Sequence, residues 1–181
     1  GTQPGVPVMR RIPARDAGPN SLQAEAPIFE DETYGELQVR LSELGALTLV
    51  EVLTLISLGK AEETPQDDSR ATYAVKVTRD ASRIDWKDPA LEISRLIRAS
   101  DPKPGAFTKT PKGDVKLFGP KVMDGIKGQP GEVLSAKGEL VIACGIDALR
   151  ISGVQPEGKS RMTALEWIHG RGAAIGDRYG G

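Results

Sequence analysis

The sequence has one cysteine, one histidine and few aromatic side chains, and each shortage excludes a class of chemistry. Cys144 by itself cannot form an internal disulfide or a cysteine-rich metal site, so a reducing compartment is the simpler interpretation. His169, close to the C-terminus, is the single candidate for a histidine base. No His, Cys and Asp side chains cluster with metal-ligand spacing, so we expect no metal.

The chain also lacks a strong net charge and a long hydrophobic run. Its formal charge is −1, which excludes a strongly basic nucleic-acid coat and a polyacidic tail. The longest apolar stretch, residues 44–58, contains Glu51 and is too short to span a bilayer. No signal peptide is visible, so we expect a soluble cytoplasmic protein without a membrane partner. A chain of 181 residues is long enough for one large domain or two small ones.

A long amphipathic helix over residues 33–58 is the clearest element that the sequence predicts. Thr33 and Glu36 have the spacing of a capping box, and apolar side chains then recur every three or four residues as far as Ile56. Only two short extended segments, residues 6–11 and 22–28, precede the helix. Since they are too small to cover its apolar face, we expect part of this domain to lie outside the chain.

The second half of the sequence differs in pattern and in charge. A second helix is predicted over residues 88–98, and a short terminal helix over 163–169, followed by a glycine-rich end that frays. Five short strand candidates with glycine turns are typical of a small barrel or sandwich, and they are residues 107–108, 115–122, 131–136, 140–144 and 148–154. Residues 100–181 carry a net charge of +3, against −4 for residues 1–99, which favours a polyanionic partner for the basic half.

Several ordinary structural roles are also predicted. Trp86 and Trp167 are expected in the core or as linker anchors, Cys144 as an unreactive buried strand residue, and Asp85 in a turn or as a cap.

Eleven short segments, in order from residue 4 to residue 162, together resemble the methionyl-tRNA formyltransferase family. No single segment is specific, but their order and spacing are. They are residues 4–6, 15–18, 41–46, 65–67, 71–76, 83–86, 97–99, 102–106, 130–134, 154–159 and 161–162.

The resemblance implies the fold class α/β plus β. Residues 1–60 would be the C-terminal remnant of a Rossmann-like formyltransferase domain, residues 61–105 a linker with one helix, and residues 106–181 an OB-like β-barrel. It also implies transfer of the formyl group of 10-formyltetrahydrofolate to the methionine amino group of initiator methionyl-tRNA. The amine attacks the formyl carbon, a tetrahedral oxyanion forms and tetrahydrofolate leaves.

The resemblance also implies site residues. Of the family's Asn, His and Asp set, Asp16 alone has a counterpart here, where it would orient and polarise the histidine and assist proton transfer. The family's Asn and His lie upstream of the matched region, and His169 falls in the other domain, so we expect no turnover by these residues alone. The loop around Asp16 would lie against the folate and consists of Pro13, Ala14, Arg15, Ala17 and Gly18. Arg15 and Ala17 depart from the family's Leu and Thr there.

Charge and position together suggest contacts with tRNA phosphates. The candidates are Lys76, Arg79, Arg98, Lys116, Lys159 and Arg161, and for each one a solvated side chain is an equally ordinary interpretation. Few aromatics follow residue 100, which favours backbone contact with a folded RNA over base stacking. The family suggests a monomer. Two alternatives stay open: a related folate-dependent formyltransferase that acts on a sugar nucleotide or hydrolyses the folate, and a non-catalytic RNA-binding module derived from such an enzyme.

Overall fold

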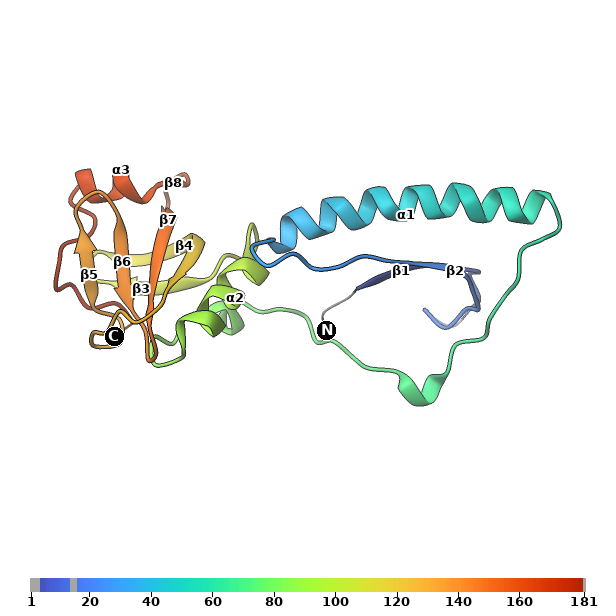
Figure 1. Cartoon of the computed structure of the whole chain (residues 1–181), viewed down its shortest axis with the longest axis horizontal. Helices are drawn as coiled ribbons and strands as arrows, with labels where there is room; N and C mark the ends of the chain where they lie inside the picture. The colour runs from blue at the N-terminus through green and yellow to red at the C-terminus, as the bar shows by residue number, and fades with distance from the viewer. Residues whose placement is uncertain (1–3, 14–15, 181) are drawn as a thin grey trace. The chain divides into compact units, whose positions relative to one another are not determined.

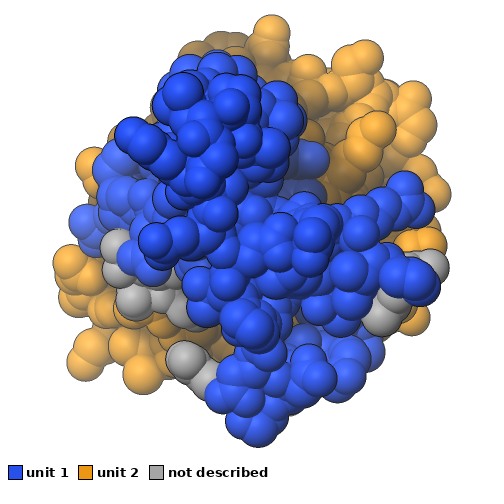
Figure 2. Space-filling model, turned by 90° about the vertical axis from the view of Figure 1, so that its right-hand side faces the viewer, with its two compact units in different colours: residues 1–75 blue, residues 76–181 orange. Residues whose placement is uncertain are grey.

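The computed structural model of the protein describes residues 4–13 and 16–180. The chain divides into two compact units, residues 1–75 and 76–181, which are coloured separately in Figure 2. The boundary between the two units lies between Val75 and Lys76. The expected division into three domains, residues 1–60, 61–105 and 106–181, stays a prediction.

Unit 1 combines a two-stranded antiparallel sheet with one long helix (Figure 1). Strand β1 (Gly5–Met9) pairs with β2 (Asn20–Glu25), and helix α1 (Tyr34–Ser57) packs on both. The capping box predicted at the start of α1 is confirmed, because the Glu36 N–H donates to Thr33 Oγ1 while the Glu36 carboxylate accepts from the Thr33 N–H at 2.9 Å. A single-turn 3-10 helix, η1 (Asp68–Arg70), follows further along.

The apolar face of α1 is covered only in part. Thr48 and Val52 are its buried residues, whereas the side chains of Leu47 and Val50 are 71% and 64% exposed. The prediction that two short strands are too small to cover this helix is therefore confirmed.

Unit 2 is built around a curled antiparallel sheet. The elements of this unit are η2 (Asp80–Ser82), α2 (Ala90–Ser100), β3 (Phe107–Thr110), β4 (Gly113–Met123), β5 (Val133–Ala136), β6 (Leu140–Ala143), β7 (Ala148–Pro156), β8 (Met162–Thr163) and α3 (Ala164–His169). The strand order in the sheet is β3-β4-β7-β6-β5, and β8 pairs with β7. Helix α2 packs against β4, and helix α3 packs against β7.

The expected fraying of the glycine-rich end is wrong. Beyond α3 the chain runs along the edge strand β5, where the Val133 N–H donates to the Asp177 carbonyl and the Tyr179 N–H to the Gly131 carbonyl. The Gly180 N–H then donates to Lys109 in β3, at the other edge of the sheet. Because the segment bonds to both edges, it ties the two ends of the curled sheet together and satisfies edge groups that would otherwise be unpaired.

The core of unit 2 confirms the burial predicted for three residues. Trp86 is 3% exposed, Trp167 8% and Cys144 3%, and all three belong to one cluster of buried side chains. Cys144 lies immediately after β6 and not within a strand, so the strand position predicted for it is wrong. The Asp85 carboxylate accepts the Lys87 N–H at 3.0 Å, which confirms the predicted turn.

Two buried ionisable groups predict loss of stability at alkaline pH. Burial raises the pKa of the Cys144 thiol from 9.0 to about 12 and that of the Tyr179 hydroxyl from 10.0 to about 12. Above about pH 9 the unfolded chain releases these protons while the folded unit retains them, so the free energy of unfolding falls as pH rises. We expect urea unfolding followed by circular dichroism to show this loss, and Cys144→Ala to make it shallower; an equally steep loss in the variant would contradict the assignment to Cys144.

Among the described residues, no helix is both long enough and apolar enough to cross a bilayer.

Candidate functional site

The Asp16 loop of unit 1 is held in place by a side chain from a distant part of the chain. Gln66 Nε2 donates to the Asp16 carbonyl at 3.0 Å and to the Gly18 carbonyl at 2.7 Å. Asp16 itself has a φ of 55°, in the left-handed region that Asp and Asn enter more readily than most residues. The loop therefore presents an exposed carboxylate on a backbone that Gln66 fixes on both sides.

The base of this loop is a close crossing of two backbone segments. The Arg10 N–H donates to the Pro19 carbonyl at 3.1 Å, and a Cβ built on Gly18 would lie 1.7 Å from the Arg10 carbonyl oxygen. Only glycine fits there. Asn20 and Thr64 exchange two backbone hydrogen bonds, at 2.9 and 2.8 Å, which bring the Gln66 segment alongside.

Asp16 lines two cavities in unit 1. One, of about 570 Å³, has Met9, Ile12 and Pro13 as apolar lining and Arg10 and Arg11 as cations. The other, of about 1010 Å³, is lined by Ala17 and by residues of the 65–74 segment, including Gln66. Of the predicted folate loop, Pro13, Ala17 and Gly18 thus surround Asp16, whereas Ala14 and Arg15 lie outside the described residues.

In unit 2 a row of side chains crosses one face of the sheet. Phe107 on β3 is the register partner of Lys116 on β4, which is in turn the register partner of Gln155 on β7. Directly opposed residues of antiparallel strands project on the same face. The neighbouring β4 residues Val115 and Leu117 are buried in the core, so the row lies on the outer face of the sheet.

Two arginine guanidinium groups stack on aromatic rings on this outer face, and each arginine also forms an ion pair with an aspartate. The Arg79 guanidinium lies 4.9 Å from the centroid of the Phe107 ring and forms an ion pair with Asp114 at 3.0 Å. The Arg161 guanidinium lies 3.9 Å from the Phe118 centroid. It also binds both carboxylate oxygens of Asp101, at 3.0 and 3.3 Å. Both arginines therefore have a fixed orientation before any ligand arrives.

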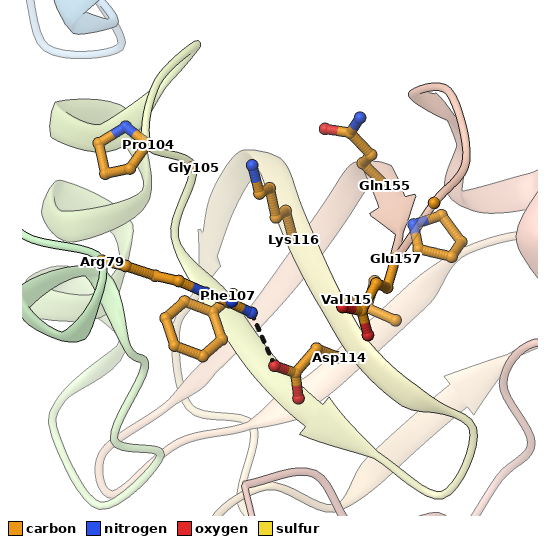
Figure 3. Close-up of a pocket in the computed structure, with 11 residues that line it drawn as sticks. Arg79, Pro104, Gly105, Phe107, Asp114, Val115, Lys116, Gln155 and Glu157 are labelled. Atoms are coloured by element: carbon orange, nitrogen blue, oxygen red, sulfur yellow. Dashed lines mark hydrogen bonds and ion pairs between the residues drawn. The ribbon is translucent and has the colours of Figure 1, made fainter.

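A cavity of about 410 Å³ opens beside Arg79 (Figure 3). Phe107 supplies apolar lining, and Lys116 and Gln155 extend side by side from the sheet. The turn after β7 completes the wall, with Glu157 as its charged member.

Only some of the residues predicted to contact tRNA lie together at this cavity. Arg79 and Lys116 line the cavity, and Lys159 is exposed in the turn that follows Gly158 on its wall. Arg98 lies half-buried in the last turn of α2, and Lys76 is exposed in a segment without helix or strand. Their contact with RNA stays a prediction.

Two glutamines that the sequence analysis did not single out contribute to these sites. Gln66 fixes the Asp16 loop, and Gln155 faces the unit 2 cavity with its Nε2 donating to the Lys159 carbonyl at 3.0 Å. Both fall inside segments that carry the family resemblance, which was the available signal. Within the part of the chain that the structure describes, no group of three His, Cys, Asp or Glu side chains could hold a metal ion.

Comparison with known proteins identifies the fold family. Residues 76–172, more than half of the chain, match the family model described as the C-terminal domain of formyl transferases. The chain belongs to the formyl transferase family. The resemblance seen in the sequence is thereby confirmed.

Named relatives of this formyl transferase chain agree with that placement. The methionyl-tRNA formyltransferase of Parvibaculum lavamentivorans is 40% identical over 170 residues, which cover 92% of this chain and 54% of the relative. That of Pseudomonas putida is 42% identical over 168 residues, with the same two coverages. The chain thus spans about half the length of the curated relatives it matches.

A solved structure supports the fold of this formyl transferase chain. HypX from Aquifex aeolicus, in complex with tetrahydrofolic acid, superposes with a TM-score of 0.74 at 23% identity, covering 91% of this chain and 30% of HypX. At that identity the likeness shows the fold alone.

Proposed function

We propose that this chain is the C-terminal part of a methionyl-tRNA formyltransferase, which transfers the formyl group of 10-formyltetrahydrofolate to the methionine amino group of initiator methionyl-tRNA. The observation that carries the proposal is the 40–42% identity with two curated proteins of that name over 92% of this chain. Such a role in translation initiation belongs to the cytoplasm.

Asp16 is the catalytic residue of the chain in this proposal. Its carboxylate orients and polarises a histidine and assists proton transfer, which is the part of acyl transfer to an amine that needs a positioned acid–base group. The double hydrogen bond from Gln66 supports this role, because it fixes the backbone on either side of Ala17 and thereby the position of the carboxylate.

The cavity beside Asp16 has the chemistry that a folate requires. Met9, Ile12 and Pro13 offer an apolar wall to a flat heterocycle, and Arg11 offers a cation to carboxylates. When bound, 10-formyltetrahydrofolate supplies the formyl group. The identity with curated methionyl-tRNA formyltransferases, rather than the fold likeness to HypX, supports a folate as the formyl donor.

The finer description of the fold belongs to the same proposal. Unit 1 corresponds to the end of a Rossmann-like domain, and unit 2 to an OB-like barrel that contacts tRNA, in a monomeric enzyme. The curled sheet whose edges the C-terminal segment ties together supports the barrel.

Binding of initiator tRNA by the 181-residue chain tests the RNA half of the proposal. Lys76 and Lys159 are exposed cations among the candidate contacts, and each phosphate that they neutralise adds to the dependence of binding on salt. We expect the Lys76→Ala, Lys159→Ala double variant to reduce the slope of log K against log salt by about two, because each lost contact removes about one.

The matched control removes two exposed lysines outside the candidate set, Lys127 and Lys137. Its slope should equal that of the wild type. If the wild-type chain does not bind initiator tRNA in this titration, the tRNA substrate is refuted, and the alternative that acts on a sugar nucleotide becomes the better explanation. Binding of tRNA without formyl transfer by any longer form of the protein would favour the non-catalytic RNA-binding module.

A further inference from the structure

The unit 2 cavity differs from a phosphate-binding patch in its charge. Two cations line it, Arg79 and Lys116, and two anions, Asp114 and Glu157, so its formal charge is zero. A surface that binds only the nucleic-acid backbone carries an excess of positive charge. The balance here, together with the apolar lining from Phe107, suits a flat polar group better than a run of phosphates.

Arg79 has the features of a stacking platform. The Phe107 ring covers one side of the Arg79 guanidinium group, and Asp114 forms an ion pair with its Nη2. The Arg79 side chain is nevertheless 63% exposed. Because Asp114 already neutralises its charge, the group is fixed in place while its planar surface stays accessible. RNA bases that are not paired stack on arginine guanidinium planes as well as on aromatic rings.

Gln155 supplies a directed acceptor in the same cavity. Its Nε2 donates to the Lys159 carbonyl at 3.0 Å, which determines the orientation of the amide and leaves Oε1 as an acceptor. An acceptor pairs with the exocyclic amino group of adenine, cytosine or guanine, whereas uracil offers only its ring N3–H, which lies elsewhere on the base. Beside it, Lys116 has no ion-pair partner among the described residues, so its ammonium is available to one phosphate.

From this arrangement we propose that the cavity binds one unpaired, amino-bearing nucleobase of an RNA. The base stacks on Arg79, its amino group donates to Gln155 Oε1, and an adjoining phosphate binds Lys116. The volume of about 410 Å³ lies within the range of about 300–1,000 Å³ found for small-molecule sites. The site rests on the proposed RNA-binding function and adds base recognition to it.

The test uses the whole 181-residue chain and three RNA hairpins that share one stem. One hairpin has a bulged adenine, one has a bulged uracil, and one is fully paired. We expect fluorescence anisotropy to show the bulged-adenine hairpin binding about tenfold more tightly than the paired hairpin, since one stacked base contributes a factor of roughly 5 to 150. The bulged-uracil hairpin should fall between them.

Two variants assign the effect to named side chains. Arg79→Lys keeps the charge and the ion pair with Asp114 but removes the planar group, so it should lose the preference for a bulge without changing the salt slope. Gln155→Ala should keep the preference for a bulge and lose the preference for adenine over uracil. Arg150→Lys, at an exposed position on β7 outside the cavity, is the matched control and should bind like the wild type.

The outcomes separate this site from the proposed function. Equal binding of bulged and paired hairpins, or an Arg79→Lys variant that retains the tenfold preference, overturns the nucleobase site even if initiator tRNA binds. A bulge preference in a chain that does not bind initiator tRNA supports the site and refutes the tRNA substrate. If the chain binds neither the three hairpins nor initiator tRNA, both the nucleobase site and the proposed tRNA-binding function are overturned.

Discussion

Asp16→Asn is expected to lower kcat/KM for formyl transfer by about 10²–10⁴-fold, in a protein of the relatives' full length that contains these residues. The substitution removes the charge and the proton acceptor. It leaves the backbone undisturbed, because Asn tolerates the φ of 55° that Asp16 adopts and Gln66 donates to backbone carbonyls rather than to the carboxylate. Steady-state kinetics with saturating folate and varied methionyl-tRNA would measure the loss.

Asp68→Asn is the matched control for this experiment. Asp68 lines one of the two cavities that Asp16 lines, so the variant changes the local charge by the same amount. We expect the control to retain activity within a factor of about two, since it removes no proton-transfer group. Equal losses of kcat/KM in the two variants would assign the effect to the local negative charge and not to proton transfer by Asp16. An Asp16→Asn protein with normal activity would refute the catalytic role of Asp16.

Trp86→Ala is expected to destabilise unit 2 by about 3–5 kcal/mol, the usual cost of truncating a buried tryptophan. Trp86 is 3% exposed, its Nε1 donates to Thr108 Oγ1 at 2.9 Å, and its ring lies 6.5 Å from that of Tyr179. The loss would therefore open a cavity beneath the C-terminal segment. Urea unfolding followed by the fluorescence of Trp167, the other tryptophan of the chain, reports on unit 2 directly.

Trp86→Phe is a milder change for the same measurement. It keeps an aromatic ring in the core but removes the bond to Thr108 and part of the indole volume, so we expect a smaller cost of about 2 kcal/mol. Tyr73→Ala serves as the exposed control, because the Tyr73 side chain is 96% exposed and should contribute almost nothing. If both Trp86 variants unfolded at the wild-type urea concentration, Trp86 would not be a core anchor.

Local chemistry made much of the fold predictable from the sequence. The capping box at Thr33 and the strand patterns after residue 106 depend on neighbours within a few residues, and each appears as expected. The fate of the glycine-rich end was not predictable in that way. Its hydrogen bonds to Gly131, Val133 and Lys109 reach across tens of residues of chain, and no local pattern encodes such partners.

For the candidate sites, too, residue identities were predictable from the sequence and long-range contacts were not. The sequence by itself determined the family, the position of Asp16 and the basic character of the second half, because these follow from residue identities and their order. Only the tertiary structure decided that Gln66 donates hydrogen bonds to the Asp16 loop. The same is true of Arg79, which stacks on Phe107 and forms an ion pair with Asp114. Those contacts join residues up to about fifty positions apart, where register and chain reversal rather than local preference determine which side chains meet.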